Sequence, residues 1–313
     1  MPLTNTQLRY YDSNVLRLPQ ERRKEYHAQV DYLVQELSSA LKDKTKIKIT
    51  KVVKAGSFAK HTILRKTSED PVDVDIVFYI AGKSVDKETR STLMDLIYEE
   101  LIEVYPNKKV KEFEIQRKAA TVEFVGSGLS VDIVPVIEIA SRPNFGWQYG
   151  TDGSKTLTCA PCQIDFVKKR KNEDADFRTL VRMTKRWRRH KELSAISGFT
   201  VELLVAHALQ VDGTGYSIEQ RFQRILAYIA RSELKEVISF PENTNPLGTF
   251  TDPVVILDPV NSNNNVAARI TEAERKEIVA AAQESYEVSH LASVDDDVDM
   301  WKQVFGPRFK VED

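Results

Sequence analysis

Two aspartates one residue apart, Asp73 and Asp75, come directly before an apolar run at 76–80. A run of this kind is typical of a strand that is buried on both faces. In an extended strand, residues i and i+2 point to the same face, about 7 Å apart along the backbone. Two carboxylates on one face repel each other unless a cation lies between them. The pair therefore predicts a divalent metal site, and through the metal a triphosphate site, at the mouth of a buried strand.

A third acid, Asp132, lies in another β-rich run at 131–136. Before it, residues 120–125 alternate between apolar and polar types, and the Gly-Ser-Gly sequence at 126–128 is typical of a hairpin turn. Asp132 is therefore expected on a strand next to the first one. Three carboxylates from two adjacent strands can bind two Mg²⁺ ions, about 4 Å apart, for in-line nucleotidyl transfer. An Asp-x-Asp pair by itself would equally fit a solvated strand end or a turn.

Gly56 and Ser57 follow an alternating segment at 46–52, which predicts a half-exposed strand. Glycine permits a positive φ and a close backbone approach, and serine adds a hydroxyl group. The N–H groups of such a turn can cradle a phosphate. A plain strand-to-helix turn is the alternative interpretation. A polar link, which includes residues 66–70, connects this turn to the two aspartates.

The order of these motifs resembles the signature of the DNA polymerase β-like nucleotidyltransferases: a Gly-Ser pair, then Asp-x-Asp, then a single Asp. Further stretches are similar to the branch that contains oligoadenylate synthetase and cyclic GMP-AMP synthase. These stretches are 166–170, 180–187, 201–204 and the Asp-Pro…Asn-Asn-Val segment within 257–266. The chain thus resembles the bacterial CD-NTases, the signal-making enzymes of anti-phage CBASS systems, from its first long helix to about Val266.

The resemblance implies an α+β fold with a polymerase β-like nucleotidyltransferase core and a C-terminal helical lobe. The core would contain a mixed sheet, helices and a long N-terminal spine helix. A loop-rich segment at 142–161 indicates the boundary, so we expect domains at 1–160 and 161–313. Apolar residues at helical spacing predict helices at 19–42, 84–105, 163–171, 218–238 and 271–291.

The resemblance also implies that Lys185 reaches the nucleotide triphosphate, whose negative charge it would offset. Arginines at 178, 182 and 189 share its helix face, and a solvated face or contacts with the product strand are expected for them. In relatives a serine binds phosphate and an aromatic ring stacks on a base, which assigns these roles to Ser197 and Phe199. A core aromatic is the alternative for Phe199.

This chain departs from the family pattern in two places. Ser197 lies one residue earlier than the serine of relatives, so that Gly198 takes the matching position. His61 stands where relatives often have glycine.

Composition places the chain among ordinary globular proteins, with 313 residues, 42% hydrophobic and 29% charged. The chain has no apolar stretch long enough for a membrane span, and its first residues lack the apolar core of a signal peptide. We therefore expect a cytoplasmic protein that does not contact the membrane. The formal net charge of -1 means that DNA or RNA binding, which is left open, would need a local patch.

Cys159 and Cys162 form a Cys-x-x-Cys motif, which would suit half of a zinc site or a redox pair. A structural zinc site needs four ligands, and no second pair of cysteines is present in the sequence. Two reduced thiols in a loop are therefore the favoured interpretation.

The predicted function is a nucleotidyltransferase that joins NTPs, ATP above all, into a cyclic di- or trinucleotide second messenger and releases pyrophosphate. Asp73, Asp75 and Asp132 would hold Mg²⁺, with Mn²⁺ as a substitute, and Asp132 is the candidate general base. The alternatives are linear 2′–5′ oligoadenylate synthesis, polynucleotide tailing, and an inactive module that binds a nucleotide or a partner protein. The resemblance further implies a HORMA-type regulator with an AAA+ ATPase, and a downstream effector that reads the product.

Overall fold

A computed structural model describes residues 2–65 and 71–312 of the chain. By their contacts the residues divide into two units, one formed by Leu18–Asp165 and the other by Met1–Arg17 with Phe166–Asp313. We name them the sheet unit and the helical unit. The polar link at 66–70 lies outside the described residues.

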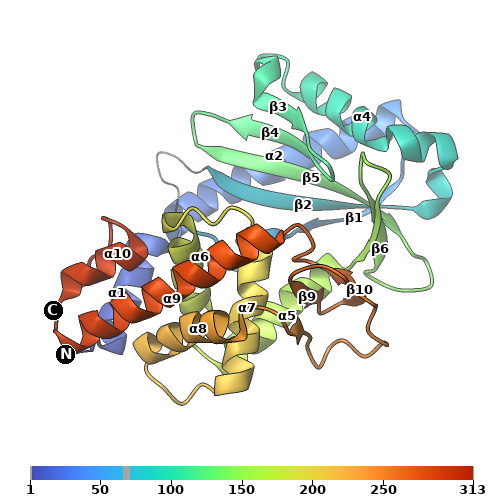
Figure 1. The fold of residues 1–313 in the computed structure, drawn as a ribbon. Helices are drawn as coiled ribbons and strands as arrows, with labels where there is room; N and C mark the ends of the chain where they lie inside the picture. Colours follow the sequence, from blue (N-terminus) through green and yellow to red (C-terminus); the bar gives the residue numbers. More distant parts are fainter. Residues whose placement is uncertain (1, 66–70, 313) are drawn as a thin grey trace. The chain divides into compact units, whose positions relative to one another are not determined.

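A seven-stranded mixed sheet forms the centre of the sheet unit (Figure 1). Its strands are β1 (Ile49–Lys54), β2 (Val72–Ile80), β3 (Phe113–Ile115), β4 (Ala120–Phe124), β5 (Leu129–Glu138), β6 (Gly146–Tyr149) and β7 (Lys155–Thr158). Their order is β1-β2-β5-β4-β3, and β6 pairs with β5 and β7. β2 and β5 run parallel, whereas the other paired strands run antiparallel. The two strands predicted to carry the acids are therefore direct neighbours.

The two faces of β2 bury different sets of side chains. Its even-numbered residues belong to the main hydrophobic core. Val77 and Tyr79 instead belong to a smaller cluster with Ala55 and Val136. Because side chains alternate along a strand, Asp73 and Asp75 lie on the face of the smaller cluster. This face is the one on which a site can form, since helices cover the other.

Helices α2 (Gln20–Lys44) and α4 (Lys87–Val104) cover the face of the main core. The buried stripe of α2 consists of Tyr26, Val30, Leu33, Leu37 and Leu41. Their spacing of three or four residues is the helical periodicity that predicted a helix at 19–42. Pro19 lies at the N-cap position, one residue before the helix begins.

The helical unit contains most of the remaining helices. These are α1 (Asn5–Tyr11), α6 (Phe177–His190), α7 (Gly198–Asp212), α8 (Ile218–Ser232), α9 (Glu272–Val294) and α10 (Trp301–Phe305). A small sheet is formed by β8 (Val237–Ile238), β9 (Val255–Asp258) and β10 (Asn261–Asn265). Helix α9 starts with a capping box formed by Thr271 and Glu274. Helix α5 (Ala160–Glu173) contains the boundary between the units.

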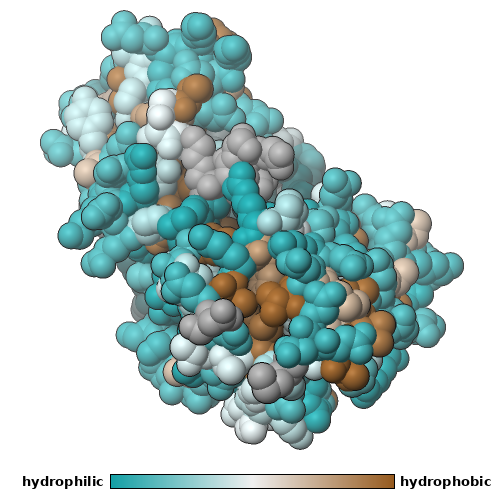
Figure 2. All heavy atoms as spheres, turned by 90° about the vertical axis from the view of Figure 1, so that its left-hand side faces the viewer, coloured by the Kyte–Doolittle hydropathy of each residue, from teal (hydrophilic) through white to brown (hydrophobic). Residues whose placement is uncertain are grey.

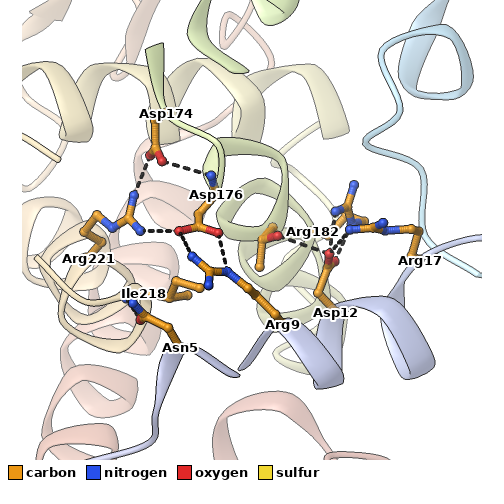
Figure 3. Close-up of polar contacts among 10 residues, drawn as sticks. Asn5, Arg9, Asp12, Arg17, Asp174, Asp176, Arg182, Ile218 and Arg221 are labelled. Carbon is orange, nitrogen blue, oxygen red and sulfur yellow. Dashed lines mark hydrogen bonds and ion pairs between the residues drawn. The ribbon is translucent and has the colours of Figure 1, made fainter. Parts of the chain in front are cut away.

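Ion pairs fasten the N-terminal segment up to Arg17 to the rest of the helical unit, whereas the sequence grouped this segment with the domain at 1–160 (Figure 3). Arg9 donates two hydrogen bonds to Asp176, at 2.9 and 3.0 Å. Asp176 also accepts a hydrogen bond from Arg221 at 2.9 Å. Asp12 accepts one from Arg182 at 2.6 Å, and Asp12 is fully buried. These contacts join residues far apart in the chain, so no local pattern could predict them.

Cys159 and Cys162 form a disulfide bond, which overturns the prediction of two reduced thiols in a loop. Cys159 directly precedes α5, and Cys162 lies in its first turn. This arrangement brings their Cα atoms to 5.3 Å, a separation that a disulfide spans. The prediction failed because the helix starts at Ala160 and not after the motif.

On the face that Figure 2 shows, hydrophilic side chains predominate. Among the described residues, no helix is both long and apolar enough to cross a membrane.

Candidate active site

Asp75 and Asp132 are register partners on the parallel strands β2 and β5. Neighbouring strands lie about 4.8 Å apart, and the side chains of partners leave the sheet on the same face. Asp73 precedes Asp75 by two residues and therefore shares this face, where it lies opposite Ser130. The structure thus brings the three predicted acids together on one face of the sheet.

The three acids differ in exposure. Asp73 is exposed, whereas Asp75 and Asp132 are half-buried. Burial raises the pKa of Asp132 above its usual value, and a hydrogen bond from Thr121 partly opposes this change. Asp132 therefore takes up a proton more readily than a solvated aspartate does, which suits a general base.

Two further residues extend this row of side chains, and the sequence analysis did not single them out. Thr121 on β4 is the register partner of Asp132, and its hydroxyl donates to Asp132 Oδ1 at 2.6 Å. Glu114 on β3 is in turn the register partner of Thr121, and its charge contributes to the raised pKa of Asp132. Thr121 could have been found from the hairpin predicted at 126–128, because a hairpin with its turn there pairs residue 121 with residue 132.

The acids match a divalent cation by chemistry. Carboxylate oxygens are the ligands that Mg²⁺ prefers, and three carboxylates on adjacent strands suit two such ions. Their oxygens do not converge on one point: no group of three His, Cys, Asp or Glu among the described residues is arranged to hold a metal ion. One oxygen of Asp132 is bound by Thr121, and Oδ2 of Asp75 faces Gly56.

The Gly-Ser turn lies against Asp75. The backbone N–H of Ala55 donates to the carbonyl oxygen of Asp75 at 2.7 Å. Gly56 has a φ of 57°, and a Cβ atom added to it would lie 1.7 Å from Asp75 Oδ2. Ser57 follows in the short helix α3 (Gly56–Ala59), with a half-buried side chain. His61 adopts a φ of 59°, a left-handed conformation that glycine adopts at lower cost.

Lys185, Ser197 and Phe199 belong to the helical unit, and the other predicted site residues belong to the sheet unit. The ammonium group of Lys185 donates to Glu202 Oε1 at 2.7 Å. The hydroxyl of Ser197 caps α7 by accepting the N–H of Thr200 at 3.0 Å. The side chain of Phe199 is half-buried, so its ring is not part of the core.

The arginines on the face of Lys185 do not form the solvated stripe that the sequence suggested. Arg182 is 2% exposed, and two of its nitrogens donate to Asp12. Arg178 and Arg189 are half-buried. The spacing of these basic residues in the sequence could not show that the carboxylate of Asp12 binds one of them.

Comparisons with known proteins identify the family and the fold. Residues 3–159 match the family described as the Second Messenger Oligonucleotide or Dinucleotide Synthetase domain, SMODS. Residues 176–292 match the second domain of tRNA nucleotidyltransferases. The two matches cover the strands with the acids and the helices with Lys185.

Two curated relatives resemble this chain over nearly its whole length. It is 60% identical to the CBASS oligonucleotide cyclase CdnC of Escherichia coli (strain KTE188), across 100% of this chain and 99% of the relative. It is 31% identical to the cyclic AMP-AMP-AMP synthase of Escherichia coli (strain MS 115-1), across 94% of both chains.

A solved structure of E. coli MS115-1 CdnC with ATP superposes with a TM-score of 0.82 at 29% identity, covering 98% of this chain and 99% of that chain. A complex of that CdnC with a HORMA protein gives a TM-score of 0.81 at 29% identity, with 98% of each chain covered. These matches confirm the predicted α+β, polymerase β-like fold.

Proposed function

The chain belongs to the CBASS oligonucleotide cyclases, which are nucleotidyltransferases, and we propose that it joins ATP into a cyclic oligonucleotide and releases pyrophosphate. The register pairing of Asp75 with Asp132 carries this proposal, because it groups the predicted acids on one face. A relative named for cyclic AMP-AMP-AMP favours a trinucleotide of AMP over a dinucleotide.

In the proposed reaction, Asp73, Asp75 and Asp132 hold Mg²⁺, or Mn²⁺ in its place. The ion, when bound, lowers the pKa of the attacking ribose hydroxyl and offsets the charge of the α-phosphate. Asp132 accepts the hydroxyl proton, the ribose oxygen forms a bond to the α-phosphorus, and the bond to the β-phosphate breaks. The register position of Asp132 beside Asp75 supports this role.

Nucleotide binding is assigned in this proposal to Gly56 and Ser57 of the sheet unit and to Lys185, Ser197 and Phe199 of the helical unit, each unit considered by itself. Gly56 and Ser57 bind phosphate oxygens through backbone N–H groups and the hydroxyl group. Lys185 offsets the charge of the triphosphate. Phe199 stacks on a base, and its half-buried ring supports this role. Ser197 is assigned to phosphate binding as well, although its hydroxyl oxygen already accepts an N–H of α7.

We also propose that a HORMA-type protein binds this chain, because such a complex has been solved for a CdnC that is 29% identical. An AAA+ ATPase that acts on the HORMA protein, and an effector that reads the product, stay predictions from the family resemblance. The activity should therefore be measured with and without the HORMA partner.

Linear 2′–5′ oligoadenylate synthesis and polynucleotide tailing are the rival activities. The match of residues 176–292 to the second domain of tRNA nucleotidyltransferases would favour polynucleotide tailing. However, the CCA-adding enzyme of Saccharolobus shibatae is only 28% identical to this chain, and the match covers only 46% of that enzyme. An inactive binding module is disfavoured, because grouped carboxylates without a ligand are costly to keep.

The test is to incubate the purified protein with each labelled NTP and Mg²⁺, with and without the HORMA protein, and to weigh the products. We expect a phosphatase-resistant product from ATP, since a ring lacks terminal phosphates. The Asp73→Asn, Asp75→Asn double variant should fold and make no product, whereas Asp152→Asn, on an exposed loop, should behave as the wild type. Product from the double variant would show that the site is wrong.

A further inference from the structure

The structure pairs Lys185 with a buried carboxylate on the next helix, and we infer that this residue, Glu202, is a positioning residue for nucleotide binding. Its carboxylate holds the ammonium group of Lys185 beside the first turn of α7, where the triphosphate is received. The inference rests on the proposed function and adds to it a residue that does not itself touch the nucleotide.

Two neighbours, Glu202 and Gly198, define the place of the ammonium group. Lys185 Nζ donates to Glu202 Oε1 at 2.7 Å, and the two side chains are only 7% and 1% exposed. Gly198 lies four residues before Glu202 and hence on the same face of α7. A Cβ atom on Gly198 would lie 3.5 Å from Lys185 Cε and 3.6 Å from Nζ. The ammonium group therefore lies between the Glu202 carboxylate and the start of α7.

The carboxylate is needed because the start of a helix is an unfavourable place for a cation. The first N–H groups of a helix and its dipole favour anions. Burial adds a desolvation cost for the lysine charge, which an opposite charge at hydrogen-bond distance offsets. An ammonium group has three N–H donors, so one bond to Glu202 does not by itself exhaust its hydrogen-bonding capacity. The N-terminus of α7 and the ammonium group of Lys185 therefore attract a polyanion together more strongly than either group would alone.

A purely structural ion pair makes different predictions from a positioning pair. Breaking a structural pair lowers the free energy of unfolding and leaves nucleotide affinity in the folded protein unchanged. Loss of a positioning carboxylate weakens nucleotide binding in the ground state and the transition state alike, so KM rises more than kcat falls. It also makes binding sensitive to pH, because burial without a counter-charge favours the neutral amine.

The test compares Glu202→Gln, which keeps the shape and loses the charge, with Glu202→Asp, which keeps the charge. Glu219→Gln is the matched control, since Glu219 is also 1% exposed and accepts hydrogen bonds from Ser293 and the backbone of Leu3. Equilibrium binding of a non-hydrolysable ATP analogue, kcat and KM are measured from neutral to alkaline pH, on variants whose folding is checked by circular dichroism.

We expect Glu202→Gln to raise both Kd and KM about tenfold, as for the loss of a hydrogen bond between charged groups, with kcat changed less. Its Kd should rise further with pH, at a pH where the wild type and Glu219→Gln still bind normally. Glu202→Asp should recover most of the affinity and the wild-type pH dependence, and it tests the inference if the glutamine variant does not fold.

Unchanged Kd and unchanged pH dependence in folded Glu202 variants would overturn the inference. Failure of the proposed function is recognised separately, because then the wild type makes no cyclic product. The binding measurement does not depend on turnover and decides the role of Glu202 in either case.

Discussion

Gly56 and Asp75 lie so close that no side chain fits between them: a Cβ atom on Gly56 would be 1.7 Å from Asp75 Oδ2. The φ of Gly56, 57°, is also one that side chains rarely permit. The glycine of the Gly-Ser motif thus leaves room for a carboxylate of the Asp-x-Asp motif. The two motifs follow each other in the sequence signature, and in the structure they are in direct contact.

The first prediction concerns this contact. Gly56→Ala should lower the rate of product formation about a hundredfold, because the new methyl group displaces Asp75, and such misplacement of a reacting group is costly. Gly126→Ala is the control, since a Cβ atom there meets nothing within 4 Å. Product formation is measured at saturating ATP and Mg²⁺. Equal rates for the two variants would mean that the position of Asp75 does not matter.

The second prediction concerns Thr121. Its hydroxyl lowers the pKa of Asp132, against the larger effect of burial. Thr121→Val removes the hydrogen bond, so the pKa of Asp132 rises further and the acidic limb of the pH–rate profile moves to higher pH. Thr121→Ser keeps the hydroxyl and should keep the wild-type profile. Coinciding profiles for all three proteins would exclude Asp132 as the ionising group.

The third prediction concerns the effect of Asp132 on the stability of the folded protein. Because the folded pKa of Asp132 is raised, the folded state binds its proton more tightly than the unfolded state does. The contribution of Asp132 to the free energy of unfolding is most favourable at a pH below its pKa in the unfolded chain, about 3.9. This contribution is lost as the pH rises through its pKa in the folded protein. Asp132→Asn should therefore raise the melting temperature at neutral pH while it abolishes activity. A lower melting temperature at neutral pH would contradict the burial argument.

The fourth prediction concerns the buried pair of Asp12 and Arg182, which are 0% and 2% exposed. Asp12→Ala leaves a buried guanidinium without its carboxylate and should cost about 3–5 kcal/mol of unfolding free energy. Glu25→Ala breaks the exposed pair with Arg22 and should cost less than about 1 kcal/mol. Denaturant unfolding measures both. Similar losses would show that the N-terminal segment is not anchored by Asp12.

The sequence was sufficient where a pattern is local. Alternation at 120–125, with a hairpin turn at 126–128, predicted the local pairing of β4 with β5. The pairing of β2 with β5 joins distant strands, and it was expected from the acids that the two β-rich runs carry. Helical spacing predicted α2 and α9. Each of these local features follows from the period of the backbone or from a tight turn.

Contacts between distant segments could not be predicted. Asp12 and Arg182 are 170 positions apart, so the sequence showed a basic stripe and not its buried partner. The carboxylate that meets Lys185 comes from the next helix, and only the packing of α6 on α7 brings Glu202 to it. The disulfide of Cys159 and Cys162 depended on where α5 begins, and helix ends are the least certain part of a sequence-based assignment.

The central claim is that Asp73, Asp75 and Asp132 bind the catalytic cations. Crystals grown with Mn²⁺ and a non-hydrolysable ATP analogue test it most directly, because the anomalous signal of manganese locates the ion. The account predicts an anomalous peak at bonding distance from the carboxylates of Asp75 and Asp132, beside the triphosphate. Nucleotide density without such a peak, or a peak held by other residues, would contradict it.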